Sequence, residues 1–126
     1  MSFTTDIRYL MTADTSLNSY CDGGLYYENL PENFDLTDTW IVYSFNKSSQ
    51  VSCLGSTAAL TEYNLTVKII SPSTITLETV SDYIVSYLNG LEYNEIGDIQ
   101  FVSDNHSLDL ERNVYMNTLQ FNILYF

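Results

Sequence analysis

The sequence predicts an α+β sandwich, in which a mainly antiparallel sheet of about four to five strands carries two helices on one face. Apolar and polar residues alternate from Thr61 to Ile70, as is typical of a half-buried strand, and an apolar stripe at helical spacing follows Thr76. The strand segments are joined in pairs by short links rather than by helices, which favours antiparallel pairing. At 126 residues, the chain is expected to form one domain, residues 1–126.

The N-terminal segment is expected to form one short helix from about Asp6 to Tyr20. Its apolar residues recur at roughly helical spacing, and Thr4, Thr5 or Asp6 would cap its start. The helix would end at Cys21–Gly24, because the paired glycines supply the left-handed backbone that closes helices.

The middle of the chain is rich in strand-forming residues. Within the loop from Leu25 to Thr39, Leu25 to Tyr27 fit a short edge strand. The run Trp40 to Phe45 is almost entirely apolar, which suits a central strand covered on both faces. The segment Asn46 to Leu60 reads as a long hairpin arm, with Val51 to Leu54 paired inside it.

The second half predicts one helix and two strands. The helix begins at Thr76-Leu77-Glu78 and stops at Asn89-Gly90, with an apolar stripe that must lie on the sheet. Strands are expected over Ile96 to Ser103 and Val114 to Phe126, joined by an acidic link in which Asp104 to Ser107 form a turn. Five apolar or aromatic residues of the last strand share one face, so this strand should lie inside the sheet: Tyr115, Leu119, Phe121, Ile123 and Tyr125.

The charge balance excludes several functions. Sixteen Asp and Glu face four Lys and Arg, which gives a formal net charge of -12. Four scattered cations cannot build the basic patch that phosphate binding requires, so the protein is not expected to grip DNA. The same shortage argues against an anionic membrane surface, and no apolar run is long enough for a transmembrane helix.

The N-terminus and the cysteines indicate a reducing compartment. The first residues lack a basic region followed by an apolar stretch, so we expect no secretory signal. Cys21 and Cys53 lie outside any CxxC motif and are expected to be free thiols.

No enzymatic constellation emerges from the residues, and no cofactor is expected. His106, the single histidine, reads as a solvated turn residue rather than a catalytic base. Asp104, His106, Asp109 and Glu111 have the ligand types for a weak cation site but fail the EF-hand pattern. Neither GxxxxGK[ST] nor GxGxxG occurs, so nucleotide binding has no support. Paired carboxylates of the glycosidase kind stay open, because sixteen acids allow many spatial pairs.

Aromatic surface and negative charge are both in surplus. Eleven Tyr and six Phe exceed the usual need of a core this size, and tyrosine is enriched at protein interfaces. The rings therefore indicate either assembly or a densely covered sheet. The acids either keep the chain in solution or line a passage through which DNA slides, because like charge repels phosphate.

The pattern of elements resembles the tail terminator (tail completion, or minor tail) proteins of long-tailed bacteriophages. The resemblance covers about Asp6 to Phe126 and lies in hydrophobic patterns rather than fixed motifs. It includes the short first helix, Gly24-Leu25-Tyr26-Tyr27 with Leu30-Pro31, Trp40-Ile41-Val42-Tyr43, Glu62 to Ile69, the helix ending at Val85 to Leu91, and the aromatic C-terminal strand.

This resemblance implies a virion protein, assembled in the host bacterial cytoplasm, that forms a hexameric ring. The ring would cap the tail tube, stop its polymerisation and meet the head connector, with DNA passing through unbound. Because a closed ring needs a heterologous interface, we expect contacts from the arm Asn46 to Leu60 and the loop Leu25 to Thr39. The contact residues expected there are Tyr26, Tyr27, Val51 and Leu54; those expected in the lumen are Asp104, Asp109 and Glu111.

Two alternatives remain beside this interpretation. The chain could be another head-tail adaptor subunit, or a small acidic DNA mimic that inhibits a DNA-binding host enzyme. A mimic presents carboxylates at duplex-like spacing on one rigid face. Here the acids are spread from Asp6 to Glu111, and the helix after Thr76 holds only Glu78 and Asp82.

Overall fold

A computed structural model describes residues 3–29, 37–52, 59–110 and 113–125, with the backbone alone for 48–52 and 59–60. It confirms the predicted α+β class. The elements in chain order are α1 (Phe3–Thr12), α2 (Thr15–Tyr20), β1 (Gly24–Tyr27), β2 (Trp40–Ser52), β3 (Ala59–Ser71), α3 (Thr74–Leu88), β4 (Ile96–Asp109) and β5 (Val114–Tyr125).

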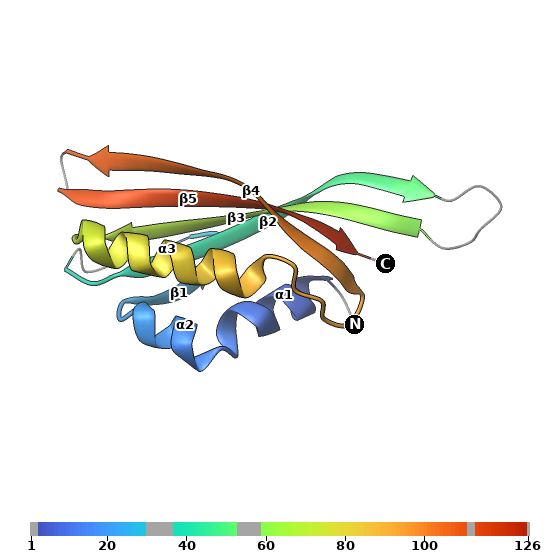
Figure 1. The fold of residues 1–126 in the computed structure, drawn as a ribbon, viewed down its shortest axis with the longest axis horizontal. Helices are drawn as coiled ribbons and strands as arrows, with labels where there is room; N and C mark the ends of the chain where they lie inside the picture. Colours follow the sequence, from blue (N-terminus) through green and yellow to red (C-terminus); the bar gives the residue numbers. More distant parts are fainter. Residues whose placement is uncertain (1–2, 30–36, 53–58, 111–112, 126) are drawn as a thin grey trace.

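The strands form one sheet in the order β1-β2-β3-β5-β4. The β2–β3, β3–β5 and β4–β5 pairs are antiparallel, and only β1 runs parallel to its neighbour β2. All three helices lie on the same side of this sheet (Figure 1). The last strand, β5, is interior as predicted, flanked by β3 and β4. The two ends of the sheet are therefore β1 and β4.

The predicted N-terminal helix is two helices. It begins at Phe3 rather than near Asp6, and it is interrupted at Asp14, whose side chain accepts a hydrogen bond from the Leu17 amide at 3.1 Å. A side chain that caps its own backbone in this way starts a new helix. The predicted end is confirmed, because α2 stops at Tyr20. The Cys21 thiol that follows is buried and free, whereas Cys53 lies outside the described residues.

The helix α3 is close to its prediction. Ser73 caps it by accepting from the Thr76 amide at 3.3 Å, so it begins two residues before Thr76. It ends at Leu88, directly before Asn89-Gly90, and Gly90 has a positive φ of 80°. The buried side chains of α3 form one stripe against the sheet: Leu77, Val80, Ser81, Ile84 and Leu88.

The predicted hairpin arm is present. Its strands are longer than predicted, because β2 continues past Phe45 and β3 begins before Thr61. The strands β2 and β3 stay paired out to Ser52 and Ala59, with one register shift between Lys47 and Ser49. In Figure 1 their outer halves extend past the helices, away from the body of the molecule. Val51 pairs with Leu60 inside the arm. Leu54 lies outside the described residues.

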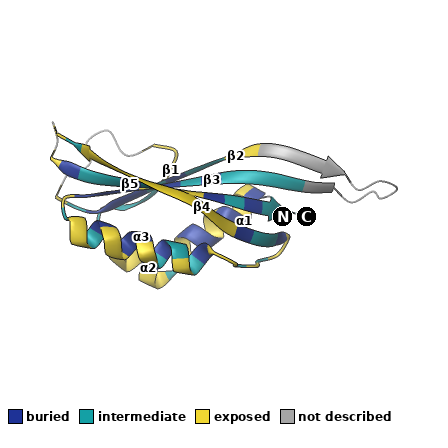
Figure 2. Cartoon of the chain, turned by 45° about the horizontal axis from the view of Figure 1, so that its top comes forward, coloured by how far each residue is buried: buried dark blue, intermediate teal, exposed yellow. Residues whose placement is uncertain are grey.

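The prediction that Asp104 to Ser107 form a turn is wrong. These residues belong to β4, which pairs with β5 without interruption from Asp104–Leu119 to Asp109–Val114. Turn-forming side chains are tolerated here because β4 is an edge strand, and its residues 100–108 are exposed (Figure 2). Backbone pairing with β5, which the local sequence does not reveal, holds this segment extended.

The main core lies between the sheet and the helices and includes Ile7, Ile41, Val67, Ile84 and Phe121. A small second cluster of Trp40, Ile70 and Val114, with Tyr26 and Met116 against it, lies on the opposite face. The prediction that β2 is covered on both faces therefore holds only near Trp40, because Val42 and Ser44 are half-exposed.

Aromatic rings join the first helix to the base of the arm. The Phe3 ring stacks on Tyr63 with centroids 3.7 Å apart, and it meets Phe45 and Tyr125 edge to face. Much of the aromatic surplus is thus used inside the molecule. None of the helices within the described ranges is long and apolar enough to cross a bilayer.

Candidate functional site

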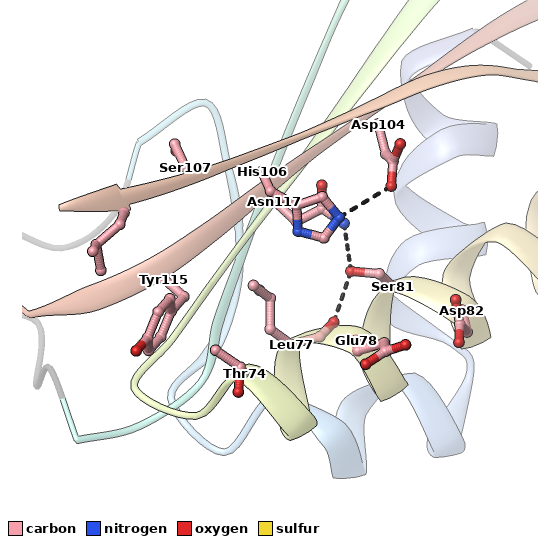
Figure 3. Close-up of a pocket in the computed structure, with 11 residues that line it drawn as sticks. Thr74, Leu77, Glu78, Ser81, Asp82, Asp104, His106, Ser107, Tyr115 and Asn117 are labelled. Atoms are coloured by element: carbon pink, nitrogen blue, oxygen red, sulfur yellow. Dashed lines mark hydrogen bonds and ion pairs between the residues drawn. The ribbon is translucent and has the colours of Figure 1, made fainter.

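A groove of about 580 Å³ lies between α3 and the β4–β5 hairpin (Figure 3). Residues between Leu77 and Asp82 of α3 line one wall of the groove. Side chains of β4 and β5 on the helix-bearing face of the sheet line the other. Its walls include Leu77, Glu78, Ser81, Asp82, Asp104, His106, Leu108, Tyr115 and Asn117.

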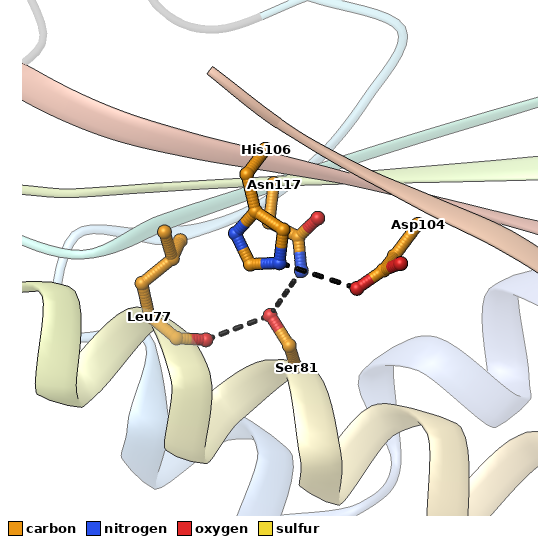
Figure 4. Close-up of polar contacts among 5 residues, drawn as sticks. All are labelled: Leu77, Ser81, Asp104, His106 and Asn117. Atoms are coloured by element: carbon orange, nitrogen blue, oxygen red, sulfur yellow. Dashed lines mark hydrogen bonds and ion pairs between the residues drawn. The ribbon is translucent and has the colours of Figure 1, made fainter. Parts of the chain in front are cut away.

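The floor of the groove is a buried hydrogen-bond chain (Figure 4). Asn117 Nδ2 donates to Ser81 Oγ at 2.8 Å, and Ser81 Oγ donates to the Leu77 carbonyl at 2.7 Å. Asn117 is fully buried, and its Oδ1 has no hydrogen-bond partner among the described residues. Buried acceptors are normally paired, so this oxygen is a polar atom on the groove floor whose hydrogen-bonding capacity the described residues leave unused.

The rim of the groove is acidic. Glu78 and Asp82, one turn apart on α3, are exposed, and Asp104 faces them from β4. His106 Nε2 lies 3.2 Å from Asp104 Oδ2, with both side chains at least half exposed. No lysine or arginine is among the described residues that line the groove. The rim therefore attracts cations.

Catalytic and metal chemistry find little support in this geometry. The Ser81 hydroxyl is engaged by Leu77 and Asn117, and the nearest partner of His106 is Asp104. No Ser-His-Asp relay is therefore formed. In the part of the chain that the structure describes, no three His, Cys, Asp or Glu side chains gather closely enough to hold a metal ion.

The structure separates the residues expected to line a lumen. Asp104 pairs across from Leu119 on the helix-bearing face, whereas Asp109 pairs across from Val114 on the opposite face. Glu111 lies outside the described residues. What the structure gathers around Asp104 is instead Glu78, Asp82 and His106.

The residues expected to contact other subunits lie at the other end of the sheet. Tyr26 and Tyr27 are on β1 and point to opposite faces: Tyr26 stacks on Trp40, and Tyr27 packs on Tyr43. Tyr27 remains 43% exposed. Val51 is in the arm, far along the chain from both, and only its backbone is described.

A second groove, of about 300 Å³, lies beside Tyr27 between α1 and β1. Arg8 of α1 and Tyr43 of β2 line it together with Tyr27. Burial raises the pKa of Tyr43, and the nearby Arg8 charge partly opposes that increase. The described lining of this groove thus holds one cation and no acid, whereas acids line the groove at α3.

Sequence reasoning missed Glu78, Asp82, Ser81, Asn117 and Arg8 as site residues. The two acids read as the solvated face of a helix. The sequence did contain a signal for Ser81 and Asn117. Both are polar residues at positions where the apolar stripe of α3 and the alternation of β5 predict apolar side chains. Their pairing across two elements required the tertiary structure.

No family model matches the chain, and no curated protein sequence does. Among solved structures, the chain is similar to a chain of a structure described as the virion of a native gene transfer agent (GTA) particle. The TM-score is 0.71 at 15% sequence identity, over 98% of this chain and 94% of that chain. The two chains thus share a fold over nearly their whole lengths.

Proposed function

We propose that the protein is a structural subunit of a phage-like virion, which forms a ring that caps the tail tube and joins it to the head connector. The observation that carries this proposal is the shared fold with a chain from a gene transfer agent virion, with nearly complete coverage of both chains. The hydrophobic patterns that resemble tail terminator proteins point to the same role. The ring is expected to be hexameric.

The shape of the subunit supports assembly into a ring. A closed ring needs two different surfaces that meet after a fixed rotation. The sheet ends in two different edge strands, β1 and β4, and the β2–β3 arm projects from the body. We expect the ring contacts to include Tyr26 and Tyr27 at the β1 edge, and Val51 and Leu54 in the arm.

The charge supports a role in which DNA passes without binding. The formal net charge of -12 repels phosphate, which favours sliding over adhesion. The part of the acidic stretch expected to face the lumen is its end, with Asp109 and Glu111, because Asp104 lies on the helix-bearing face of the sheet and Asp109 on the other. On this proposal the protein is not an enzyme, and its partners are its own copies, the tail tube and the head connector.

The assembly state tests the proposal directly. Size-exclusion chromatography with light scattering should give a ring-sized species at high concentration, and negative-stain images should show rings, alone or on the ends of tail tubes. A strictly monomeric protein that never binds tail tubes would contradict the proposal. Co-purification with a DNA-binding host enzyme would favour the DNA-mimic alternative instead.

A variant without the arm tests the expected contact element. Residues 48–62 would be replaced by a two-residue hairpin turn, so that Lys47 and Tyr63 become the last pair before the turn. The described residues of the main core lie outside this segment, so the variant should keep the helical circular dichroism signal and the cooperative unfolding of the parent. Loss of the ring with the fold retained would support the arm as a contact. Rings that form as readily without the arm would exclude it.

A further inference from the structure

The two end strands of the sheet present grooves whose described linings carry opposite charge. The α3 groove lies against the edge strand β4, and the α1 groove lies against the edge strand β1. Both grooves open on the helix-bearing side of the sheet, because helix residues line each of them. Two copies placed edge to edge, in the same orientation, would bring the β4 groove of one to the β1 groove of the next.

The β4 groove has the features of a site for a cationic side chain with several donors. Three carboxylates, of Glu78, Asp82 and Asp104, surround it without a lysine or arginine in the described lining. Asn117 Oδ1, on the floor, is a buried acceptor that lacks a donor among the described residues. The carboxamide of Asn117 extends from β5 toward α3 on the floor of the groove (Figure 4). A guanidinium carries five N–H donors and no acceptor, which matches a site with several carboxylate acceptors.

Arg8 is the cation at the opposite edge. It is exposed on α1 and forms no ion pair with any residue of the described ranges. Its neighbours Tyr27 and Tyr43 offer ring surface on which its aliphatic stem and guanidinium can rest. The other described cations lie elsewhere: Lys68 is on the sheet face opposite the helices, and Lys47 is at the base of the arm.

We propose that the acidic groove between α3 and β4 binds Arg8 of a second copy of this chain, and so joins the β4 edge of one subunit to the β1 edge of the next. This inference rests on the proposed ring and names its interface. Such a contact is heterologous, as ring closure requires. It also explains how copies that each carry a net charge of -12 can adhere: attraction is local, although the whole molecules repel.

Charge reversal tests the contact. Arg8→Glu should raise the concentration for half-assembly by about tenfold or more, which corresponds to about 1.4 kcal/mol. The double variant Glu78→Arg/Asp82→Arg should weaken assembly similarly. Combining all three substitutions in one chain should restore assembly to within about threefold of the parent, because the pair is then reversed.

Lys68→Glu is the matched control, because it changes the net charge by the same amount as Arg8→Glu on the opposite face of the sheet. Its effect should be no more than about twofold. All four variants change exposed residues, and circular dichroism with thermal unfolding checks that each is folded.

The outcomes separate this inference from the proposed function. The Arg8 contact would be overturned if Arg8→Glu affected ring formation no more than Lys68→Glu does, or if the triple variant stayed dissociated. The proposal of a ring would be unaffected by either result. A parent protein that forms no ring would instead overturn the ring. Self-association of the parent with rescue in the triple variant would support both.

Discussion

A buried carboxylate ties the first helix to the end of the chain. Asp6, in the first turn of α1, is fully buried and accepts hydrogen bonds from Asn94 Nδ2 at 3.1 Å and from the Tyr125 hydroxyl at 3.2 Å. Its charge also lies at the positive end of the helix dipole. Three segments that are far apart in sequence therefore meet at one side chain.

Asp6→Ala should destabilise the protein by about 2 kcal/mol, because two donors lose a charged acceptor in a place that water does not reach. Urea unfolding followed by circular dichroism measures the change. Asp98→Ala is the control: Asp98 accepts only an exposed hydrogen bond from Gln100, so the change should stay within about 0.5 kcal/mol. Equal effects of the two substitutions would show that the Asp6 contacts add nothing.

Glycine is required at position 23 because the Trp40 side chain packs closely against it, and not because of an unusual backbone conformation. A Cβ placed on it would overlap with the indole ring of Trp40. That ring belongs to the small cluster with Ile70 and Val114, so it cannot move without opening the cluster.

Gly23→Ala should lower the stability by about 2 kcal/mol through overpacking, and it should shift the tryptophan fluorescence. Gly90→Ala gives a useful contrast, because a Cβ there meets nothing within 4 Å but the φ of 80° is unfavourable. We expect about 1 kcal/mol for that strain, with unchanged fluorescence. An unaltered spectrum in the Gly23 variant would contradict the steric argument.

At the scale of elements, tyrosines hold α3 against the N-terminal helices. The Tyr87 hydroxyl donates to the Leu10 carbonyl at 2.9 Å, and the Tyr83 hydroxyl donates to the Asp14 carboxylate that caps α2. Burial is the main cause that raises the pKa of Tyr87 to about 12, and the nearby Asp14 charge adds to it. For Tyr83, the hydrogen bond to Asp14 is the main cause of a raised pKa.

These contacts predict a loss of stability at alkaline pH. Tyrosine is neutral when protonated, and its unfolded pKa is about 10. A folded pKa near 12 means that the folded state keeps the proton, so this stabilisation is complete below pH 10 and is lost as the pH rises toward 12. The melting temperature of the parent should therefore fall across that interval.

Tyr87→Phe should reduce the alkaline slope and lower the stability by about 1 kcal/mol at neutral pH, where the hydrogen bond is lost. Tyr26→Phe is the matched control, because Tyr26 stacks on Trp40 on the other face of the sheet, and it should keep the slope of the parent. Thermal unfolding between pH 9 and 12 measures both. A slope that is the same in the Tyr87 variant and the parent would exclude Tyr87 as its source.

Elements whose signal is local were predicted well. The helix α3, the β2–β3 arm and the strand β5 followed from periodicity, caps and alternation. The predictions of two elements were wrong, because contacts with residues far apart in the sequence determine where these elements begin and end. The N-terminal helix divides at Asp14, where the new cap also binds Tyr83 of α3, and β4 stays extended through Asp104 to Ser107 because β5 pairs with it.

At the scale of the whole molecule, the excess negative charge opposes compaction. The chain has a formal net charge of -12, and the described acids lie on helices, strands and loops. Their mutual repulsion is long-range and therefore sensitive to salt.

Sodium chloride at a few hundred millimolar should raise the melting temperature by about 3 °C, because screening relieves self-repulsion. Differential scanning calorimetry on dilute protein, checked by light scattering for a single species, measures this effect. The rise should level off as the Debye length becomes shorter than the spacing between surface charges. A melting temperature that falls or stays constant with salt would contradict a role for repulsion.

The sequence alone determined the α+β class, the mainly antiparallel sheet, the helix α3, the interior position of β5 and the acidic character of the surface. These properties depend on composition and on periodicities of a few residues, which neighbouring positions reveal. Only the tertiary structure decided that Asp104 faces Glu78 and Asp82 while Asp109 does not, and that Asn117 meets Ser81 beneath them. The physical reason is that strand register and helix packing bring together residues far apart in the chain, and no local pattern encodes which of them meet.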